Sequence, residues 1–253
     1  MNIRIILFFT LFSISNTFSA TILIDPGHGG EENGAISSVD GSKEKDLAME
    51  LALLIRNQLL SGHHVYLSRT SDQTLKLEQR AGTAQRIGAD IFISVHMNSS
   101  ESKHSHGFET YYLSNDLDEA TKKVVRVENG EHSHPMKGVG EVDSMTGEIL
   151  AEIVVSENIP ESKKLGELVH SRLKKSLPNK YKIKDRGLKP GLFYVLAMTK
   201  VPGILLEAGF LSSQKDLELM KNREYLNDYA KNVAEGVNHY FSSIKKLNNS
   251  AAR

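Results

Sequence analysis

The chain has 253 residues, of which 40% are hydrophobic, and its 31 Lys and Arg residues balance 31 Asp and Glu residues. This composition is typical of a globular domain and excludes intrinsic disorder, and the balanced charge argues against nucleic acid as a partner. Because the chain has no cysteine, disulfide bonds, thiolate metal ligands and cysteine-dependent catalysis are excluded. Any metal must therefore bind to His and carboxylate side chains.

The first twenty residues have the layout of a signal peptide. One basic residue, Arg4, precedes an apolar run over Ile5–Phe12, and small and polar residues follow. The run is shorter than the about 20 residues that a membrane-spanning helix needs, so we expect an exported protein without a permanent membrane span. Cleavage is expected after Ser19 or Ala20, and the alternative interpretation of this segment is an N-terminal strand of the core.

Strands and helices alternate in the first half of the chain. Apolar runs predict strands over residues 21–25, 64–68, 90–96 and 107–112. Helical spacing of apolar residues predicts helices over 46–60 and 81–87. This alternation is typical of an α/β fold with a mostly parallel twisted sheet, flanked by helices on both faces.

The pattern weakens between residue 114 and about residue 150, which we interpret as a candidate regulatory insertion. Helical periodicity returns over residues 149–177 with an interruption near Pro160, and strands are expected at 193–196 and 201–207, before a last helix at 225–241. We therefore expect one catalytic domain over residues 21–243, after a signal peptide over 1–20. Residues 244–253 are expected to form a frayed tail.

Four residues with metal-binding or acid–base side chains stand beside these elements: His28, Glu44, His96 and Glu207. All but Glu44, which opens a helix, follow or end predicted strands, where ligands collect in parallel sheets. Two imidazoles and one carboxylate leave a fourth tetrahedral position for water, which is typical of catalytic zinc. Their spacing alone does not establish a site, because a strand-end histidine is more often structural and Glu207 could be a solvated carboxylate.

The motifs around these four residues carry a family resemblance. They are IDPGHGG at Ile24–Gly30, KEKD at Lys43–Asp46, SVHMN at Ser94–Asn98 and LLEAGFL at Leu205–Leu211. Together they resemble the zinc-dependent N-acetylmuramoyl-L-alanine amidases, a family that includes bacterial division enzymes. The resemblance implies Zn²⁺ ligands at His28, Glu44 and His96, and a catalytic role for Glu207.

The same resemblance implies a substrate and a cellular role. The substrate is peptidoglycan, hydrolysed at the amide between N-acetylmuramic acid and L-alanine, and the roles are cell-wall remodelling and daughter-cell separation. Together with the signal peptide, this predicts a periplasmic enzyme, with secretion as the alternative. Asn98 is expected either to line the substrate cleft or to cap a turn.

Division amidases carry an insertion whose helix covers the zinc until an activator protein removes it. Residues 114–150 occupy the corresponding place, and the resemblance implies that Glu119 or Glu128 fills the open zinc position. The alternative is a solvated surface helix, since the segment is rich in charge. The histidine pairs His104/His106 and His132/His134 lie in polar sequence, where such pairs are more often silent.

Two other classes of protein compete with this interpretation. One is a wall-binding or regulatory protein without activity, which loss of a zinc residue would favour, and all four site residues are present. The other is a serine enzyme that binds penicillin, because S-x-x-K occurs at 42–45, 100–103 and 171–174. Its accompanying S-D-N and K-T-G motifs are absent. A nucleotide-binding enzyme is disfavoured because the chain has no G-x-x-x-x-G-K loop.

Overall fold

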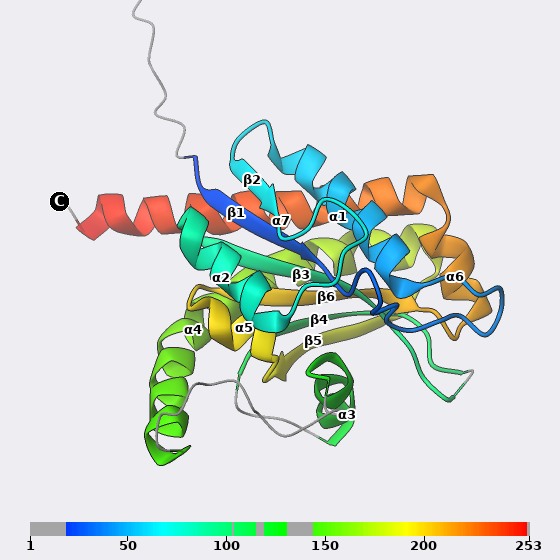
Figure 1. Ribbon diagram of the computed structural model, residues 1–253. Coiled ribbons are helices and arrows are strands. Elements are labelled where there is room, and N and C mark those ends of the chain that lie inside the picture. The colour runs from blue at the N-terminus through cyan, green and yellow to red at the C-terminus, as the bar shows by residue number, and fades with distance from the viewer. Residues whose placement is uncertain (1–18, 103, 115–118, 131–143, 252–253) are drawn as a thin grey trace, which may run out of the picture.

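Six strands form one sheet in the computed structural model, which describes residues 19–102, 104–114, 119–130 and 144–251 (Figure 1). In chain order they are β1 (Thr21–Pro26), β2 (His64–Leu67), β3 (Ile91–Asn98), β4 (Phe108–Leu113), β5 (Asp185–Gly191) and β6 (Gly203–Phe210). Their order across the sheet is β2-β1-β3-β6-β4-β5. The first four strands in this order are parallel, whereas β4 runs antiparallel to β6, and β5 is parallel to β4. The predicted mostly parallel sheet is confirmed.

Reversal of β4 and β5 places their first residues at the edge of the sheet where β1, β3 and β6 end. The register aligns Glu207 of β6 with His96 of β3 on one side and with Glu109 of β4 on the other. Aligned residues on neighbouring strands of a sheet share a face. Three titratable side chains from three strands are therefore collected on one face at one edge.

Three long helices cover the opposite face of the sheet. They are α1 (Glu44–Leu59), α4 (Ser144–Tyr181) and α7 (Arg223–Ala251), and α7 packs against both of the others. Alternate strand residues such as Ile22, Ile93 and Ile204 point into this layer and form the larger apolar core with it. This core is the rigid support of the strands whose ends carry the titratable residues.

The face that carries the titratable residues has thinner cover. α2 (Leu77–Ile87) and α5 (Tyr194–Thr199) pack on it, and α3 (Glu119–Glu128) lies over β5. The apolar side chains of these helices meet Leu23, Phe92 and Leu205 of the strands in a smaller core. A further short helix, α6 (Gln214–Met220), packs against β6.

Two expectations about secondary structure are wrong. Residues 193–196, expected as a strand, begin α5, because an apolar run this short does not distinguish a strand from a buried helix. The interruption expected near Pro160 does not end the helix, since α4 continues through both Pro160 and Pro178. Proline removes one backbone hydrogen bond and bends a helix without always ending it. The first part of α4 accordingly points away from the sheet in Figure 1, whereas the second part lies along α7.

Parts of the predicted signal peptide and of the predicted insertion lie outside the described residues. Residues 1–18 of the expected signal peptide and residues 131–143 of the insertion, with His132 and His134, lie outside the described part. α7 continues to Ala251, through most of the segment expected to form a tail. Within the described residues, no helix combines the length and the apolar character that crossing a membrane requires.

Candidate metal centre and active site

The loop after β1 holds its first histidine in an unusual backbone conformation. His28 has φ 56°, in the left-handed region, where non-glycine residues are strained and cluster at functional sites. Gly27 before it has no room for a side chain, because a Cβ would lie 2.5 Å from Cε1 of His96. The two histidine rings consequently stand edge to face with their centroids 5.0 Å apart.

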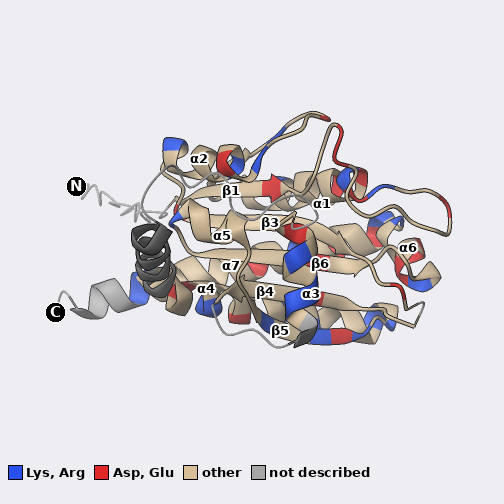
Figure 2. Cartoon of the chain, turned by 60° about the horizontal axis from the view of Figure 1, so that its bottom comes forward, with Lys and Arg blue, Asp and Glu red and all other residues tan. Residues whose placement is uncertain are grey.

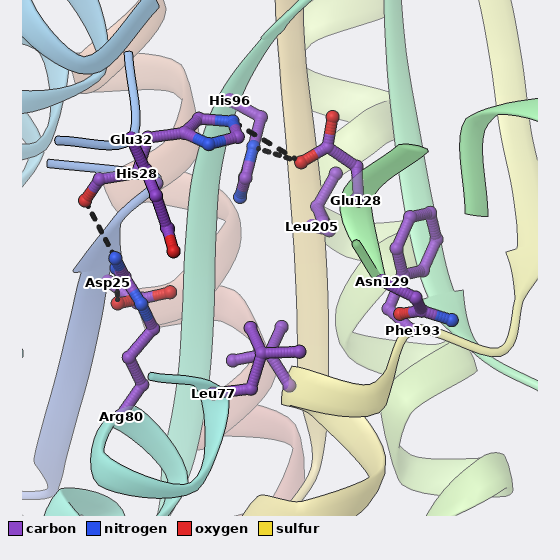
Figure 3. A pocket seen from close by; sticks show the side chains of 12 residues that line it. Asp25, His28, Glu32, Leu77, Arg80, His96, Glu128, Asn129, Phe193 and Leu205 are labelled. Carbon is purple, nitrogen blue, oxygen red and sulfur yellow. Dashed lines mark hydrogen bonds and ion pairs between the residues drawn. The ribbon is translucent and has the colours of Figure 1, made fainter. Parts of the chain in front are cut away.

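Two buried arginines fix this loop by binding its carbonyl groups. Arg80 of α2 donates to the carbonyls of Pro26 at 2.9 Å and His28 at 2.6 Å. Arg69 donates to the carbonyls of Pro26 at 3.0 Å and Gly27 at 2.9 Å. Since the guanidinium is planar and rigid, these bonds set the direction of the loop as well as its position. Figure 3 shows Arg80 reaching from α2 to His28.

The carboxylate of Asp25, at the end of β1, neutralises Arg80. Asp25 Oδ1 accepts a hydrogen bond from Arg80 Nη1 at 2.8 Å and another from the hydroxyl of Ser68. The hydroxyl of Ser94 donates to Asp25 Oδ2 at 3.1 Å. A buried charge of this kind is stable only when it is paired and hydrogen-bonded. Asp25 is therefore a supporting residue whose lone pairs are already occupied.

Glu44, the first residue of α1, is aimed between the two histidines. Its Oε2 accepts from the backbone N–H of Ala35 at 2.8 Å, and its Oε1 accepts from that of Met97 at 3.0 Å. One oxygen lies 3.1 Å from His28 Nε2 and the other lies 3.0 Å from His96 Nδ1. Backbone donors from two separate segments thus hold this carboxylate in a single orientation.

A fourth side chain completes the group from above the sheet. Glu128, the last residue of α3, brings Oε2 to 2.8 Å from His96 Nδ1 and 3.5 Å from His28 Nε2 (Figure 3). One ligand atom from each of His28, Glu44, His96 and Glu128 lies within 4.8 Å of the others. We refer to these four residues as the metal cluster.

The charges of the metal cluster favour a cation at its centre. Burial by itself would lower the pKa of His28, but Glu44 and Glu128 outweigh burial and raise this pKa to about 11. Burial likewise opposes protonation of His96, and Glu128 and Glu44 raise its pKa to about 9. Two carboxylates buried this closely therefore require positive charge beside them, either as protons on the histidines or as a metal ion.

The geometry of the metal cluster fits a metal ion. Within the described residues, His28 Nε2 and Glu128 Oε2 are buried and have no partner in hydrogen-bond geometry, although they lie close to one another. Buried polar atoms are nearly always hydrogen-bonded, so unpaired atoms that converge on one point fit a cation between them. Two imidazoles with carboxylates are a donor set typical of zinc.

Glu207 of β6 stands next to the metal cluster without being part of it. Its side chain is completely buried, and neither carboxylate oxygen has a hydrogen-bond partner within the described residues. Burial, followed by the charges of Glu128, Glu44 and Glu109, raises the pKa of Glu207 well above its ordinary value. A solvated strand-end carboxylate is thereby excluded, because the side chain is withdrawn from water. A free, buried carboxyl with a raised pKa has the properties of a general acid or base.

Comparison with known proteins agrees with these features. The family profile described as N-acetylmuramoyl-L-alanine amidase matches residues 22–239. The chain belongs to the N-acetylmuramoyl-L-alanine amidase family.

Named relatives and solved structures place the chain among enzymes of this class. The amidase CwlM of Bacillus licheniformis is 33% identical over 227 residues, which cover 88% of this chain and 70% of CwlM. AmiA of Escherichia coli is 29% identical, over 87% of this chain and 75% of AmiA. The crystal structure of an amidase from Clostridium difficile 630 superposes with a TM-score of 0.67 at 27% identity, covering 89% of this chain and 98% of that structure. The protein is therefore an amidase of peptidoglycan, as the sequence motifs predicted.

In this amidase, α3 is a packed element and not a solvated surface helix. Thr121 and Val125 are buried on its inner side, one turn apart and in line with Glu128. Asn129 follows, and its side-chain amide donates to the carbonyl of Leu192 at 3.0 Å and accepts from the N–H of Tyr194 at 2.8 Å. α3 is thus anchored to the segment before α5 directly beside the residue that enters the metal cluster.

The pocket of the amidase begins at the metal cluster and extends beneath α3 toward the smaller core. Its polar side carries His28, His96 and Glu128, and its apolar side is formed by Leu77, Phe193, Val195 and Leu205 (Figure 3). Asp25, Glu32 and Arg80 also line the pocket, so charged groups form much of its wall. The metal cluster therefore opens onto a recess with one polar and one apolar side.

The remaining predicted site residues are placed as follows. Asn98 is buried, its Oδ1 accepts from the N–H of Ser99 at 2.7 Å, and its Nδ2 has no partner within the described residues. This bond joins Asn98 only to the next residue, and Asn98 is not among the residues that line the pocket described above, so its two expected roles stay predictions. Glu119 is the first residue of α3, and its side chain lies outside the described part. His104 and His106 are not members of the metal cluster.

Sequence reasoning did not single out two charged residues near Glu207. Glu109 is buried in β4, and Lys189 of β5 lies 3.0 Å from its carboxylate. A signal for Glu109 was present in the sequence, because it is the one acidic residue in the otherwise uncharged strand FETYYL. Lys189 gave no such signal, since an isolated lysine in a polar segment is ordinary at a surface.

Proposed function

We propose that this amidase is a zinc-dependent enzyme that hydrolyses the amide between N-acetylmuramic acid and L-alanine and is held in a latent state by α3. The convergence of ligand atoms from His28, Glu44, His96 and Glu128 within 4.8 Å of one another carries this proposal, and two of these atoms, His28 Nε2 and Glu128 Oε2, have no hydrogen-bond partner within the described residues. His28, Glu44 and His96 would hold the metal, because all three stand on elements fixed by the main core or by buried arginines. When bound there, zinc polarises a carbonyl and lowers the pKa of a bound water molecule toward about 7.

Glu207 supplies the proton transfers of the reaction. Its free carboxylate oxygens can accept the proton of the attacking water and then deliver that proton to the departing amine of L-alanine. Burial supports both steps, since it raises the pKa of Glu207 and so makes the carboxylate a stronger base and retains the proton until the amide bond breaks. The neighbouring Glu44 is not assigned this role, because it is a proposed zinc ligand and two backbone N–H groups fix its orientation.

Digestion of purified peptidoglycan tests the reaction. The full-length protein carrying Glu128→Ala, which relieves the proposed inhibition, is incubated with the polymer, with and without a chelator, and the new ends are identified by mass spectrometry. We expect free N-terminal L-alanine and unsubstituted lactyl groups, and no product after chelation, with activity restored by added zinc. Cleavage elsewhere, or activity that survives complete metal removal, would contradict the proposed reaction. Binding to the polymer without new ends would favour the alternative of an inactive wall-binding protein.

The proposed latency rests on the position of Glu128. Its Oε2 occupies the place between the two histidines that substrate or water would need, and the buried residues Thr121 and Val125 hold α3 there. A protein activator that displaces α3 would open the site. This role for residues 114–150 follows the behaviour that the resemblance implies, with Glu128, and not Glu119, as the proposed inhibitory residue.

Substitution on α3 tests this regulation. Glu128→Ala should raise the rate of muropeptide hydrolysis by the full-length protein, because it empties the fourth position without removing a proposed zinc ligand. Lys123→Ala is the matched control, since Lys123 is an exposed residue of the same helix that pairs weakly with Glu101 at 3.8 Å and lies on the side of α3 away from the metal cluster. Deletion of residues 114–148 should raise the rate as well. An unchanged rate in folded Glu128→Ala protein would exclude inhibition by this residue.

We also propose that the enzyme is exported to the periplasm and acts in cell-wall remodelling and daughter-cell separation. The layout of residues 1–20 supports export, because a basic residue and an apolar run are followed by small residues before the first strand. Fractionation of cells that produce the full-length protein tests the location. Recovery of the unprocessed chain from the cytoplasm alone would contradict it.

A further inference from the structure

Two cationic side chains of β5 share one buried carboxylate beside the proposed active site. The Nε of Arg186 pairs with one oxygen of Glu109, and the Nζ of Lys189 lies 3.0 Å from the other. The hydroxyl of Tyr111 donates to the same carboxylate. Although burial opposes ionisation, Tyr111, Arg186 and Lys189 lower the pKa of Glu109, which therefore stays charged. We refer to Arg186 and Lys189 as the cationic pair.

The cationic pair carries more positive charge than its partner neutralises. One carboxylate stands against two cations, and the neighbouring Asp185 is already engaged by His170 at 2.9 Å and by Lys174 at 3.7 Å. Within the described residues, only the Nε of Arg186 has a polar partner, so its two terminal nitrogens are free to donate. The side chains of Arg186 and Lys189 are 27% and 21% exposed, so a ligand in solution can reach both.

The orientation of the cationic pair is fixed in advance. The guanidinium of Arg186 lies over the ring of Phe210, with 4.9 Å between Cζ and the ring centroid. The ammonium of Lys189 lies 5.7 Å from the centroid of Tyr111. Cations held over aromatic faces lose less conformational freedom when they bind an anion. A residue that only balances a buried charge does not need an orientation fixed by an aromatic ring.

The cationic pair faces the reacting groups across a single strand. Glu109 is aligned with Glu207 in the register of β4 and β6, and β5 is the next strand outward. Lys189 is close enough to Glu207 for its charge to act on that carboxyl. α3 packs over β5, so the helix that fills the metal cluster also lies over the strand of the cationic pair (Figure 2). Displacement of α3 would therefore uncover both together.

We propose that Arg186 and Lys189 bind a carboxylate on the peptide part of the substrate, and this inference rests on the proposed amidase function. Neighbouring strands are about 4.8 Å apart, so β5 lies about 10 Å from β6, and an extended peptide covers that distance in about three residues. The carboxylate is thus carried within the first three residues after the scissile amide. The terminal nitrogens of Arg186 supply the hydrogen bonds, and Lys189 supplies the additional charge.

A purely structural role is the alternative, in which the cationic pair only ties β5 to β4. The two roles differ in what they predict for substrates. A structural residue affects every substrate equally, whereas a carboxylate-binding residue affects only substrates that carry the carboxylate. The structure also offers a matched control, since Lys184 is an exposed lysine that directly precedes β5 and pairs with no carboxylate within the described residues.

The test compares two synthetic N-acetylmuramoyl tripeptides that differ only in one group, a carboxylate or its carboxamide at the second residue. The full-length chain carries Glu128→Ala so that α3 does not limit access. We expect kcat/KM for the carboxylate to exceed that for the carboxamide by about tenfold to a hundredfold, as for a charge-assisted hydrogen bond. Arg186→Gln should lower kcat/KM for the carboxylate much more than for the carboxamide and so remove most of this preference. Lys189→Gln should weaken the preference, and Lys184→Gln should preserve it.

The outcomes distinguish this inference from the function on which it rests. Equal kcat/KM for the two substrates in the parent protein, or an equal loss on both in Arg186→Gln, would overturn carboxylate binding while leaving the amidase function intact. No hydrolysis of either substrate by the parent would overturn the proposed function and this inference with it. Because exposed charges are screened by salt, we also expect the preference to decrease as ionic strength rises.

Discussion

Glu109 and Glu207 are aligned on neighbouring strands, yet their two carboxyl groups have opposite surroundings. Three side chains donate to or pair with Glu109, whereas Glu207 has no hydrogen-bond partner within the described residues. The pKa of Glu109 is accordingly lowered and that of Glu207 is raised. Two acidic groups with separated pKa values can take different roles, one as a fixed charge and the other as a proton carrier.

Replacement of these two residues should therefore have opposite effects. Glu207→Gln should reduce hydrolysis by at least about 10²-fold, because it removes the only proton carrier proposed, while the free energy of unfolding stays equal or rises. Muropeptide release and urea unfolding measure the two quantities. Glu109→Gln should instead destabilise the protein by about 3–5 kcal/mol, since it leaves two cations without their shared partner. Near-normal turnover by Glu207→Gln would refute its catalytic role.

A second prediction concerns the close approach of Gly27 to His96. In Gly27→Ala the new Cβ would lie 2.5 Å from the His96 ring, so the ring must shift and the metal cluster must lose its geometry. We expect weaker zinc binding, measured as metal bound per chain after dialysis, together with loss of activity.

Gly82 provides the control for this substitution. It lies inside α2, and a Cβ there meets no atom within 4 Å. Gly82→Ala should retain zinc and stabilise the protein by about 0.5–1 kcal/mol through a lower entropy of the unfolded chain. Equal zinc content in the two variants would show that the His96 ring tolerates displacement.

A third prediction concerns the arginine that holds the histidine loop. Arg80→Lys keeps the charge but cannot reach Asp25, Pro26 and His28 at once, so we expect a loss of about 2–4 kcal/mol of stability together with weaker zinc binding. Arg86→Lys in the same helix is the control, because Arg86 is exposed and, within the part of the chain that the structure describes, bonds only to Thr83. Equal free energies of unfolding for the two variants would mean that the loop does not need a guanidinium that donates to several groups at once.

The sequence predicts features that depend on a short segment of the chain, and it does not predict contacts between distant segments. Strand ends carrying His28, His96 and Glu207 could be predicted because apolar runs mark buried strands and the motifs around them are specific. α5 could not be predicted, since six residues show too little periodicity to separate a helix from a strand. The site at Glu109 was missed for another reason, because its partners lie 77 and 80 residues further along the chain, at Arg186 and Lys189. Only the reversed direction of β4 and β5 brings these residues to Glu207.

A fourth prediction concerns pH and His170 of α4. His170 is buried between Thr110 and Asp185, and burial lowers its pKa below the ordinary value of 6.5 despite the charge of Asp185. The unfolded chain therefore binds the proton more readily than the folded chain does. Its contribution to stability is complete above pH 6.5 and is lost as the pH falls through the folded pKa.

Urea unfolding of wild type and His170→Gln at several pH values measures this contribution. The difference in the free energy of unfolding between the two proteins should be largest at neutral pH and should shrink as the solution is acidified. A difference that stays constant from neutral to acidic pH would show that His170 does not change its protonation on unfolding.

A fifth prediction concerns the start of the mature protein. Ala20 is fully buried in the main core, its N–H donates to Nδ1 of His63 at 3.2 Å, and its carbonyl accepts from the N–H of His64 at 2.9 Å. Cleavage after Ser19 keeps this residue, whereas cleavage after Ala20 removes it. N-terminal sequencing of the exported protein should therefore begin at Ala20. A protein that begins at Thr21 should be less stable by about 2–3 kcal/mol, because a buried methyl group and two hydrogen bonds are lost.

The side-chain amide of Asn129 ties the last turn of α3 to the segment before α5, one residue after Glu128. A partner that pulls only on the first turn of α3 would tilt the helix about this attachment. Glu128, which lies next to the attachment, would then move least of all residues in the helix. Under the proposed latency, opening of the site would need a partner that breaks the Asn129 attachment itself, and tilting the far end would not be enough.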